Sequence, residues 1–148
     1  MRYEQDIFCA LILACAALNV FAITPITPDH DLRKAAVFAM GGTGYAGVMS
    51  SGERALRQVV KAPDAAARLQ SMLAASTPAG QLYALLGLRA RDRAAYDRAR
   101  EKLSDNDTEV KTMSGCIIHP QTFRELLRQI DDGRFDELLA REWPDQKR

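Results

Sequence analysis

Residues 77–88, T-P-A-G-Q-L-Y-A-L-L-G-L, decide the fold because they predict a helix that is buried on nearly every side. Thr77 followed by Pro78 is a typical helix start, since threonine caps free backbone N–H groups and proline fits the first turn. After Gly80, Gln81 is the one strongly polar side chain, so no face of the helix is polar. Such a helix is expected at the centre of a helical domain.

The segments on both sides of this helix predict shorter amphipathic helices that pack against it. Residues 92–103 carry charged side chains and an apolar stripe at helical spacing. Ser50 and Asp64 resemble helix starts, and glycines or prolines separate the segments. The expected helices span residues 30–40, 54–61, 65–75, 78–88, 92–103, 120–130 and 135–143.

This succession of helix, short turn and helix predicts an all-α fold, an antiparallel stack of short helix pairs similar to HEAT or TPR units. One small extended segment is expected near residues 108–119, with 108–113 and 114–119 as possible partners. No second copy of the pair at 77–103 is found, so a true repeat is not established.

The first 22 residues differ from the rest and resemble a signal peptide. Residues 7–22 are apolar apart from Asn19, a run too short to span a bilayer comfortably. Val20 and Ala22 suit cleavage before Ile23, which predicts a periplasmic or secreted protein. Because Arg2 is the one basic residue ahead of the run, an uncleaved anchor and a buried first helix remain alternatives. The expected division is a signal peptide at 1–22, a flexible linker at 23–30, a single helical domain at 31–143 and a frayed tail at 144–148.

Composition is typical of a globular domain and excludes few functions. The 148 residues are 47% hydrophobic and 26% charged, with a formal net charge of +1. That charge provides no electrostatic footprint for nucleic acid. The expected partner is another protein, and the membrane is contacted through the N-terminal segment if that segment stays uncleaved.

Gly42, Gly44 and Gly47 spell G-x-G-x-x-G, the pattern of a dinucleotide-binding turn. Ser51 and Gly52 interrupt the helix that should follow, and the chain has no alternating β-α-β pattern. A glycine-rich loop between helices is therefore the preferred interpretation, and a nucleotide site is a weaker alternative. Tyr45 is either a buried plug of this loop or a contact residue. The binding candidates are Gly42, Gly44, Tyr45, Gly47, Ser51, Met113 and Ser114.

Cys116, His119 and His30 are the candidate catalytic residues. Cleavage after Ala22 would leave Cys116 as the one cysteine, without an internal disulfide partner. On an extended segment, residues three apart face opposite sides, which disfavours a direct pair of Cys116 and His119. Two histidines and one cysteine do not complete a zinc site, so no metal or cofactor is expected. A free cysteine is most often a small buried hydrophobe, and a thiol-redox or catalytic role is the alternative.

The segments at 77–88 and at 112–118, T-M-S-G-C-I-I, together with the G-G-x-G-Y-A-G-type loop, resemble those of a group of small exported bacterial helical proteins. The resemblance covers roughly residues 35–130. It implies an exported helical domain, carries no established activity, and directs attention to residues 41–53 and 112–118. The leading hypothesis is a non-enzymatic interaction module that binds a protein, as an inhibitor or immunity-type factor. A small envelope enzyme or thiol-redox protein using Cys116 is the alternative.

Overall fold

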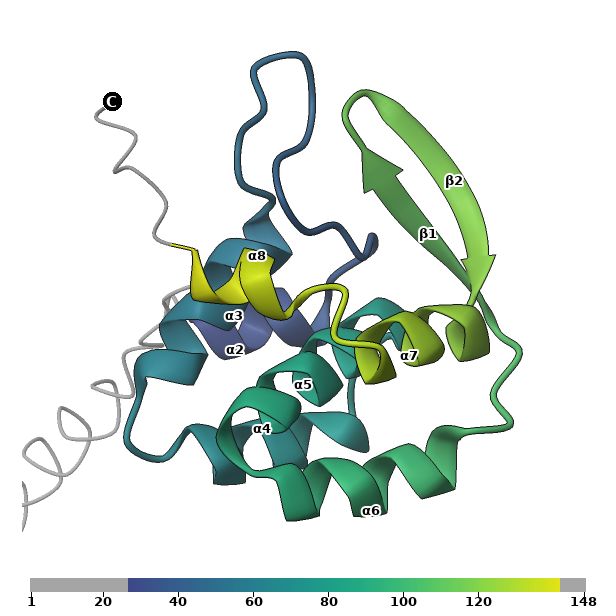
Figure 1. Ribbon diagram of the computed structural model, residues 1–148. Coiled ribbons are helices and arrows are strands. Elements are labelled where there is room, and N and C mark those ends of the chain that lie inside the picture. Colours follow the sequence, from purple (N-terminus) through teal and green to yellow (C-terminus); the bar gives the residue numbers. More distant parts are fainter. Residues whose placement is uncertain (1–26, 142–148) are drawn as a thin grey trace, which may run out of the picture.

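The computed structural model describes residues 27–141, and within this range it contains seven helices and a two-stranded antiparallel sheet (Figure 1). The expectation of an all-α fold is therefore wrong, because the protein is mostly helical but mixed. The predicted signal peptide, residues 23–26 of the linker and the C-terminal tail lie outside the described residues. The elements are α2 (Pro28–Arg33), α3 (Ser51–Lys61), α4 (Ala65–Leu73), α5 (Pro78–Arg91), α6 (Arg93–Leu103), β1 (Glu109–Ser114), β2 (Ile117–Thr122), α7 (Phe123–Asp131) and α8 (Asp136–Ala140).

Helix α5 is the centre of the molecule, as its apolar sequence predicts. It contacts α2, α3, α4, α6, α7 and β1 (Figure 1). Thr77 caps its first turn by accepting a hydrogen bond from the Gly80 N–H at 3.1 Å, and all residues from 82 to 88 are buried. A β-carbon at Gly80 would collide with the carbonyl oxygen of Leu32, so glycine is needed where α2 approaches α5.

Helices α3, α4 and α6 confirm the predicted succession of short helices around α5. The Ser50 side chain caps α3 by accepting from the Glu53 N–H at 3.0 Å. Asp92 caps α6 in the same way, accepting from the Ala95 N–H at 3.0 Å. Each cap satisfies a backbone donor that the helix itself leaves free, which explains why these starts can be read in the sequence.

The predicted helix over residues 30–40 is wrong. Helix α2 begins at Pro28, inside the expected linker, and ends at Arg33. The chain then becomes extended, and the Phe38 N–H donates to the Lys111 carbonyl of β1 at 2.8 Å. The Phe38 ring packs against Tyr83 and Phe135, with centroid distances of 4.8 and 5.3 Å. These tertiary contacts outweigh the local helical pattern of the segment.

The extended segment predicted near 108–119 is a regular hairpin that reaches further along the chain. Thr112 pairs with His119, and the strands are joined by a two-residue turn at Gly115 and Cys116. Pro120, expected to begin a helix, belongs to β2. Helix α7 begins three residues later, where Thr122 and Glu125 form a capping box.

Two segments project from the same side of the helical body. One is the stretch between α2 and α3, and the other is the β1–β2 hairpin (Figure 1). Val110 at the base of the hairpin is buried, whereas residues 114–120 are all exposed. The base of the hairpin is therefore packed in the core, and the side chains at its tip are exposed to solvent.

Candidate interaction surface

The glycine-rich segment forms a closed loop, which we call the glycine loop (residues 40–49). Thr43 and Val48 exchange two backbone hydrogen bonds, with N···O distances of 2.7 and 2.9 Å. Gly44 and Gly47 lie within the resulting turn with φ of +72° and +60°, and Gly42 precedes it with φ of +98°. Positive φ is costly for other residues, so the glycines are explained by the turn itself.

The glycine loop is hydrogen-bonded to the tip of the hairpin. The Gly44 N–H donates to the Gly115 carbonyl at 2.7 Å. Residues 38–44 run alongside β1, with parallel bridges from Phe38 to Thr112 and from Thr43 to Gly115. Two segments that are about 70 residues apart in the sequence thus present their ends side by side (Figure 1).

The ends of these two projections carry all the large hydrophobic residues that are exposed in the described part of the chain. Tyr45 is 101% exposed and Val48 38% exposed on the loop, and Ile117 and Ile118 are 60% and 52% exposed on the hairpin. We call these four residues, together with the exposed Cys116, the tip surface. Apolar side chains gathered in this way are typical of an interaction site.

Two expectations about burial are wrong at this surface. Tyr45, which was expected to be buried within the loop, is fully exposed, and Cys116 is exposed in the hairpin turn. Both residues sit at the ends of projections, where no element of the described chain packs over them. Their residue types alone favour burial, but their place in the fold overrides that preference.

Tyr83 fixes the base of the glycine loop to the core helix α5. Its hydroxyl accepts from the Ala39 N–H at 2.8 Å and donates to the Ala39 carbonyl at 2.9 Å. Ser50, on the other side of the loop, also donates to that carbonyl and lies 3.3 Å from the Tyr83 hydroxyl. Burial raises the pKa of Tyr83, so the phenol stays neutral and available as a donor.

A buried ion pair holds the same loop from the side of α3. The Glu53 side chain is fully buried, accepts from the Gly41 N–H at 2.8 Å and pairs with Arg57 at 2.7 Å. Arg57 also donates to the carbonyls of Leu138, Leu139 and Arg141 at the end of α8. One arginine thus joins α3, the glycine loop and the C-terminal helix, which limits the positions that the loop can take.

The structure brings most of the predicted binding residues to one place. Gly44, Tyr45 and Gly47 lie in the loop turn, and Ser114 is next to the Gly115 to which the loop is bonded. Met113 is half-buried on β1, opposite Ile118. Gly42 lies below the loop turn. Ser51 is exposed in the first turn of α3, away from the two tips.

The candidate catalytic residues form no catalytic arrangement within the described residues. Cys116 and His119 are both exposed, and no hydrogen bond joins their side chains. His30 lies on α2, where its imidazole is 3.9 Å from Asp31. In residues 27–141 no group of three or more His, Cys, Asp or Glu side chains could hold a metal ion.

The glycine loop also lacks the surroundings of a dinucleotide site. Such a site needs a strand of a parallel sheet before the glycines and a helix directly after them. In the part of the chain that the structure describes, the one named sheet is antiparallel and the glycines form a turn closed by Thr43 and Val48.

Val48, Ile117 and Ile118 lie within the segments 41–53 and 112–118 but are not among the individual binding candidates that the sequence indicated. Neighbouring residues of a strand point to opposite faces, so two consecutive isoleucines cannot both be covered by a core on one side. The two consecutive isoleucines directly after Gly115 and Cys116 are the sequence signal for an exposed apolar residue at this place.

Comparison of the chain with protein-family models, curated proteins and solved structures finds no match. The resemblance to exported helical proteins therefore stays an expectation based on short segments. No helix among residues 27–141 is long and apolar enough to cross a membrane.

Proposed function

We propose that this protein is an exported interaction module that binds another protein through the tip surface. One observation carries the proposal: the exposed large hydrophobic residues of the described chain gather on two adjoining projections. Isolated apolar residues are common on any protein surface, but a cluster that is held in place is not.

The shape and chemistry of the tip surface favour a protein partner over a small molecule. Small molecules bind in concave pockets, whereas these residues lie at the ends of projections. An exposed tyrosine beside aliphatic side chains is the kind of anchor that dominates protein interfaces. The loop is already ordered by Tyr83 and by the Glu53–Arg57 pair, so binding does not have to order it. We infer that the protein is an inhibitor or immunity-type factor that contacts its target through these two projections.

Export is part of the proposal and is supported by the sequence of residues 7–22, which lie outside the described residues. It would place the partner in the periplasm or the medium. The net charge of +1 supports neither a nucleic acid nor a strongly acidic partner for the molecule as a whole.

Photo-crosslinking in native cells tests the proposal. Tyr45 is replaced by p-benzoylphenylalanine, and Gln58, an exposed residue of α3, is replaced in the same way as the control. We expect irradiation to give a discrete adduct with one polypeptide from position 45 and none from position 58. Adducts from position 58 alone, or none from either position, would contradict the proposal.

A thiol function of Cys116 is the second candidate, and the exposure of this residue favours it. The same experiment separates the two functions. Under the interaction proposal, Cys116→Ser retains the adduct formed at position 45. If the partner is held through the thiol, the substitution abolishes the adduct.

A further inference from the structure

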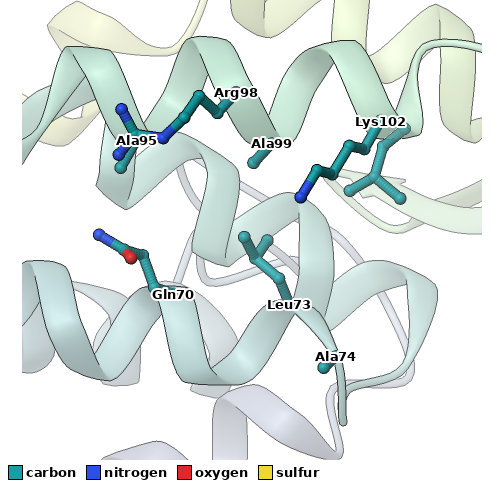
Figure 2. Close-up of a pocket in the computed structure, with 8 residues that line it drawn as sticks. Gln70, Leu73, Ala74, Ala95, Arg98, Ala99 and Lys102 are labelled. Carbon is teal, nitrogen blue, oxygen red and sulfur yellow. The ribbon is translucent and has the colours of Figure 1, made fainter.

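A groove between α4 and α6 is lined by both apolar and charged residues. It has a volume of about 390 Å³ and lies on the helical body, on elements that do not contribute to the tip surface. Its floor is formed by Leu73 of α4 and by Ala95, Ala99 and Leu103 of α6. Figure 2 shows Leu73 pointing into the gap and Lys102 extending from α6 toward α4.

The rim of the groove carries two cations that have no partner within the described residues. Arg98 and Lys102 lie one helical turn apart on α6, and both are exposed. Other arginines of the same helix are paired, Arg93 with Asp97 and Arg100 with Asp131. Among the described residues that line the groove none is acidic, so its charge is uncompensated.

We infer that this groove binds an acidic amphipathic helix of a protein partner, with apolar side chains on its floor and carboxylates against Arg98 and Lys102. The charge of the rim favours an anionic partner, and the spacing of the two cations is compatible with a helical one. Two cations about 6 Å apart along a helix match two carboxylates at positions i and i+4 of a second helix. Helix α6 is 11 residues long, or about 16 Å, which accommodates about three turns of a partner helix.

The proposal is independent of the function of the tip surface. The groove and the tips involve different elements, so variants of one leave the other unchanged. In the groove, the charges of Arg98 and Lys102 would contribute mainly to the specificity and the rate of association with an anionic partner.

A synthetic peptide tests this inference with the full-length chain. The probe is an acetylated helix of about 16 residues with leucines on one face and glutamates at i, i+4 spacing along its edge. Binding is measured by fluorescence anisotropy and mapped by amide chemical shifts. We expect the largest shifts in α4 and α6, and binding that weakens as salt is added.

The decisive comparison is the double variant Arg98→Glu with Lys102→Glu. It should weaken peptide binding by about tenfold or more, because two ion pairs become like-charge contacts. The matched control is Arg54→Glu with Arg128→Glu, which changes the net charge equally at exposed positions of α3 and α7. This control should bind the peptide nearly as tightly as the natural chain does. A small loss of affinity from the lowered net charge is expected in both double variants.

Five outcomes would overturn the inference. Three concern the peptide: no binding to the natural chain, equal effects of the two double variants, and tighter binding of a glutamine version of the peptide. A fourth is displacement of the bound peptide by oleate at a concentration below that of the competing unlabelled peptide, which would assign the groove to an anionic amphiphile. The fifth concerns self-association. Concentration-dependent dimerisation that is lost in the Arg98, Lys102 variant would assign it to a second copy of the chain.

Discussion

Among single residues, Tyr83 forms the main link between the core and the glycine loop. Its ring is fully buried in α5, and its hydroxyl binds both the N–H and the carbonyl of Ala39. A polar atom buried in this way has no access to water as a replacement partner. Tyr83 therefore contributes to stability and to the position of the tip surface at once.

We expect Tyr83→Phe to lower the free energy of unfolding by about 1–3 kcal/mol, because the Ala39 N–H loses its buried partner. Urea denaturation measures this change. Tyr45→Phe is the matched control: its hydroxyl is fully exposed, so the change should be within about 0.5 kcal/mol. Equal effects of the two substitutions would show that the Ala39 contact does not contribute.

The same variant should alter the pH dependence of stability. Burial raises the pKa of Tyr83 above its ordinary value of 10 in the folded state. As the pH rises above about 10, the unfolded chain therefore loses a proton that the folded chain keeps, and stability falls. Burial and the hydrogen bond to Asp131 raise the pKa of Tyr96 in the same direction. Tyr83→Phe should make the fall shallower without removing it.

The exposure of Tyr45 and Cys116 could not be predicted from the sequence. Cysteine is usually buried and tyrosine often is, and the sequence contains no direct signal that the two loops project from the body. The close approach of Gly44 to Gly115 is a tertiary hydrogen bond between distant segments, which no local pattern predicts. The sequence did indicate residues 41–53 and 112–118, which the structure joins through this hydrogen bond.

Among the elements, Arg57 links α3 to α8 and to the glycine loop. We expect Arg57→Ala to lower the free energy of unfolding by about 3 kcal/mol or more, because it leaves the Glu53 carboxylate buried without its charged partner. Denaturation in urea measures the change. Faster amide exchange at residues 138–141 should accompany it, because the carbonyl contacts of Arg57 are lost as well.

Arg54→Ala is the control for this prediction. Arg54 lies on the same helix but is exposed, and its removal should change stability by no more than about 0.5 kcal/mol. Addition of Glu53→Gln to Arg57→Ala should recover part of the loss, since the unpaired charge is then removed while the amide oxygen still accepts from the Gly41 N–H. A double variant that is less stable than Arg57→Ala would contradict the explanation.

Local signals predicted most of the helices, but not all of their first residues. Helix α5 begins directly after its cap Thr77, as expected, whereas α3 begins three residues before the expected start at residue 54. Pro120 resembles a helix start, but the chain there pairs with Lys111 in the hairpin. Helix α7 begins instead at Phe123, after the N-cap Thr122, and the sequence carries the signal for this start as the capping-box spacing of Thr122 and Glu125.

For the whole molecule, the helical body acts as a support for two surfaces of different chemistry. The tip surface is apolar and lies at the end of two joined projections, whereas the groove between α4 and α6 combines an apolar floor with cations. The buried central helix was predictable from its composition. The sequence also indicated the extended segment near 108–119, but the all-α class was wrong because that segment forms a regular two-stranded sheet.

In the function we propose, the glycine loop and the hairpin form one binding surface. The most direct measurement places p-benzoylphenylalanine at position 45 in one variant and at position 118 in another, and identifies the polypeptide that each captures in native cells. We predict the same partner from both positions, because Gly44 and Gly115 hold the two tips together. Different partners from the two positions, or an adduct from neither, would contradict this account of the molecule.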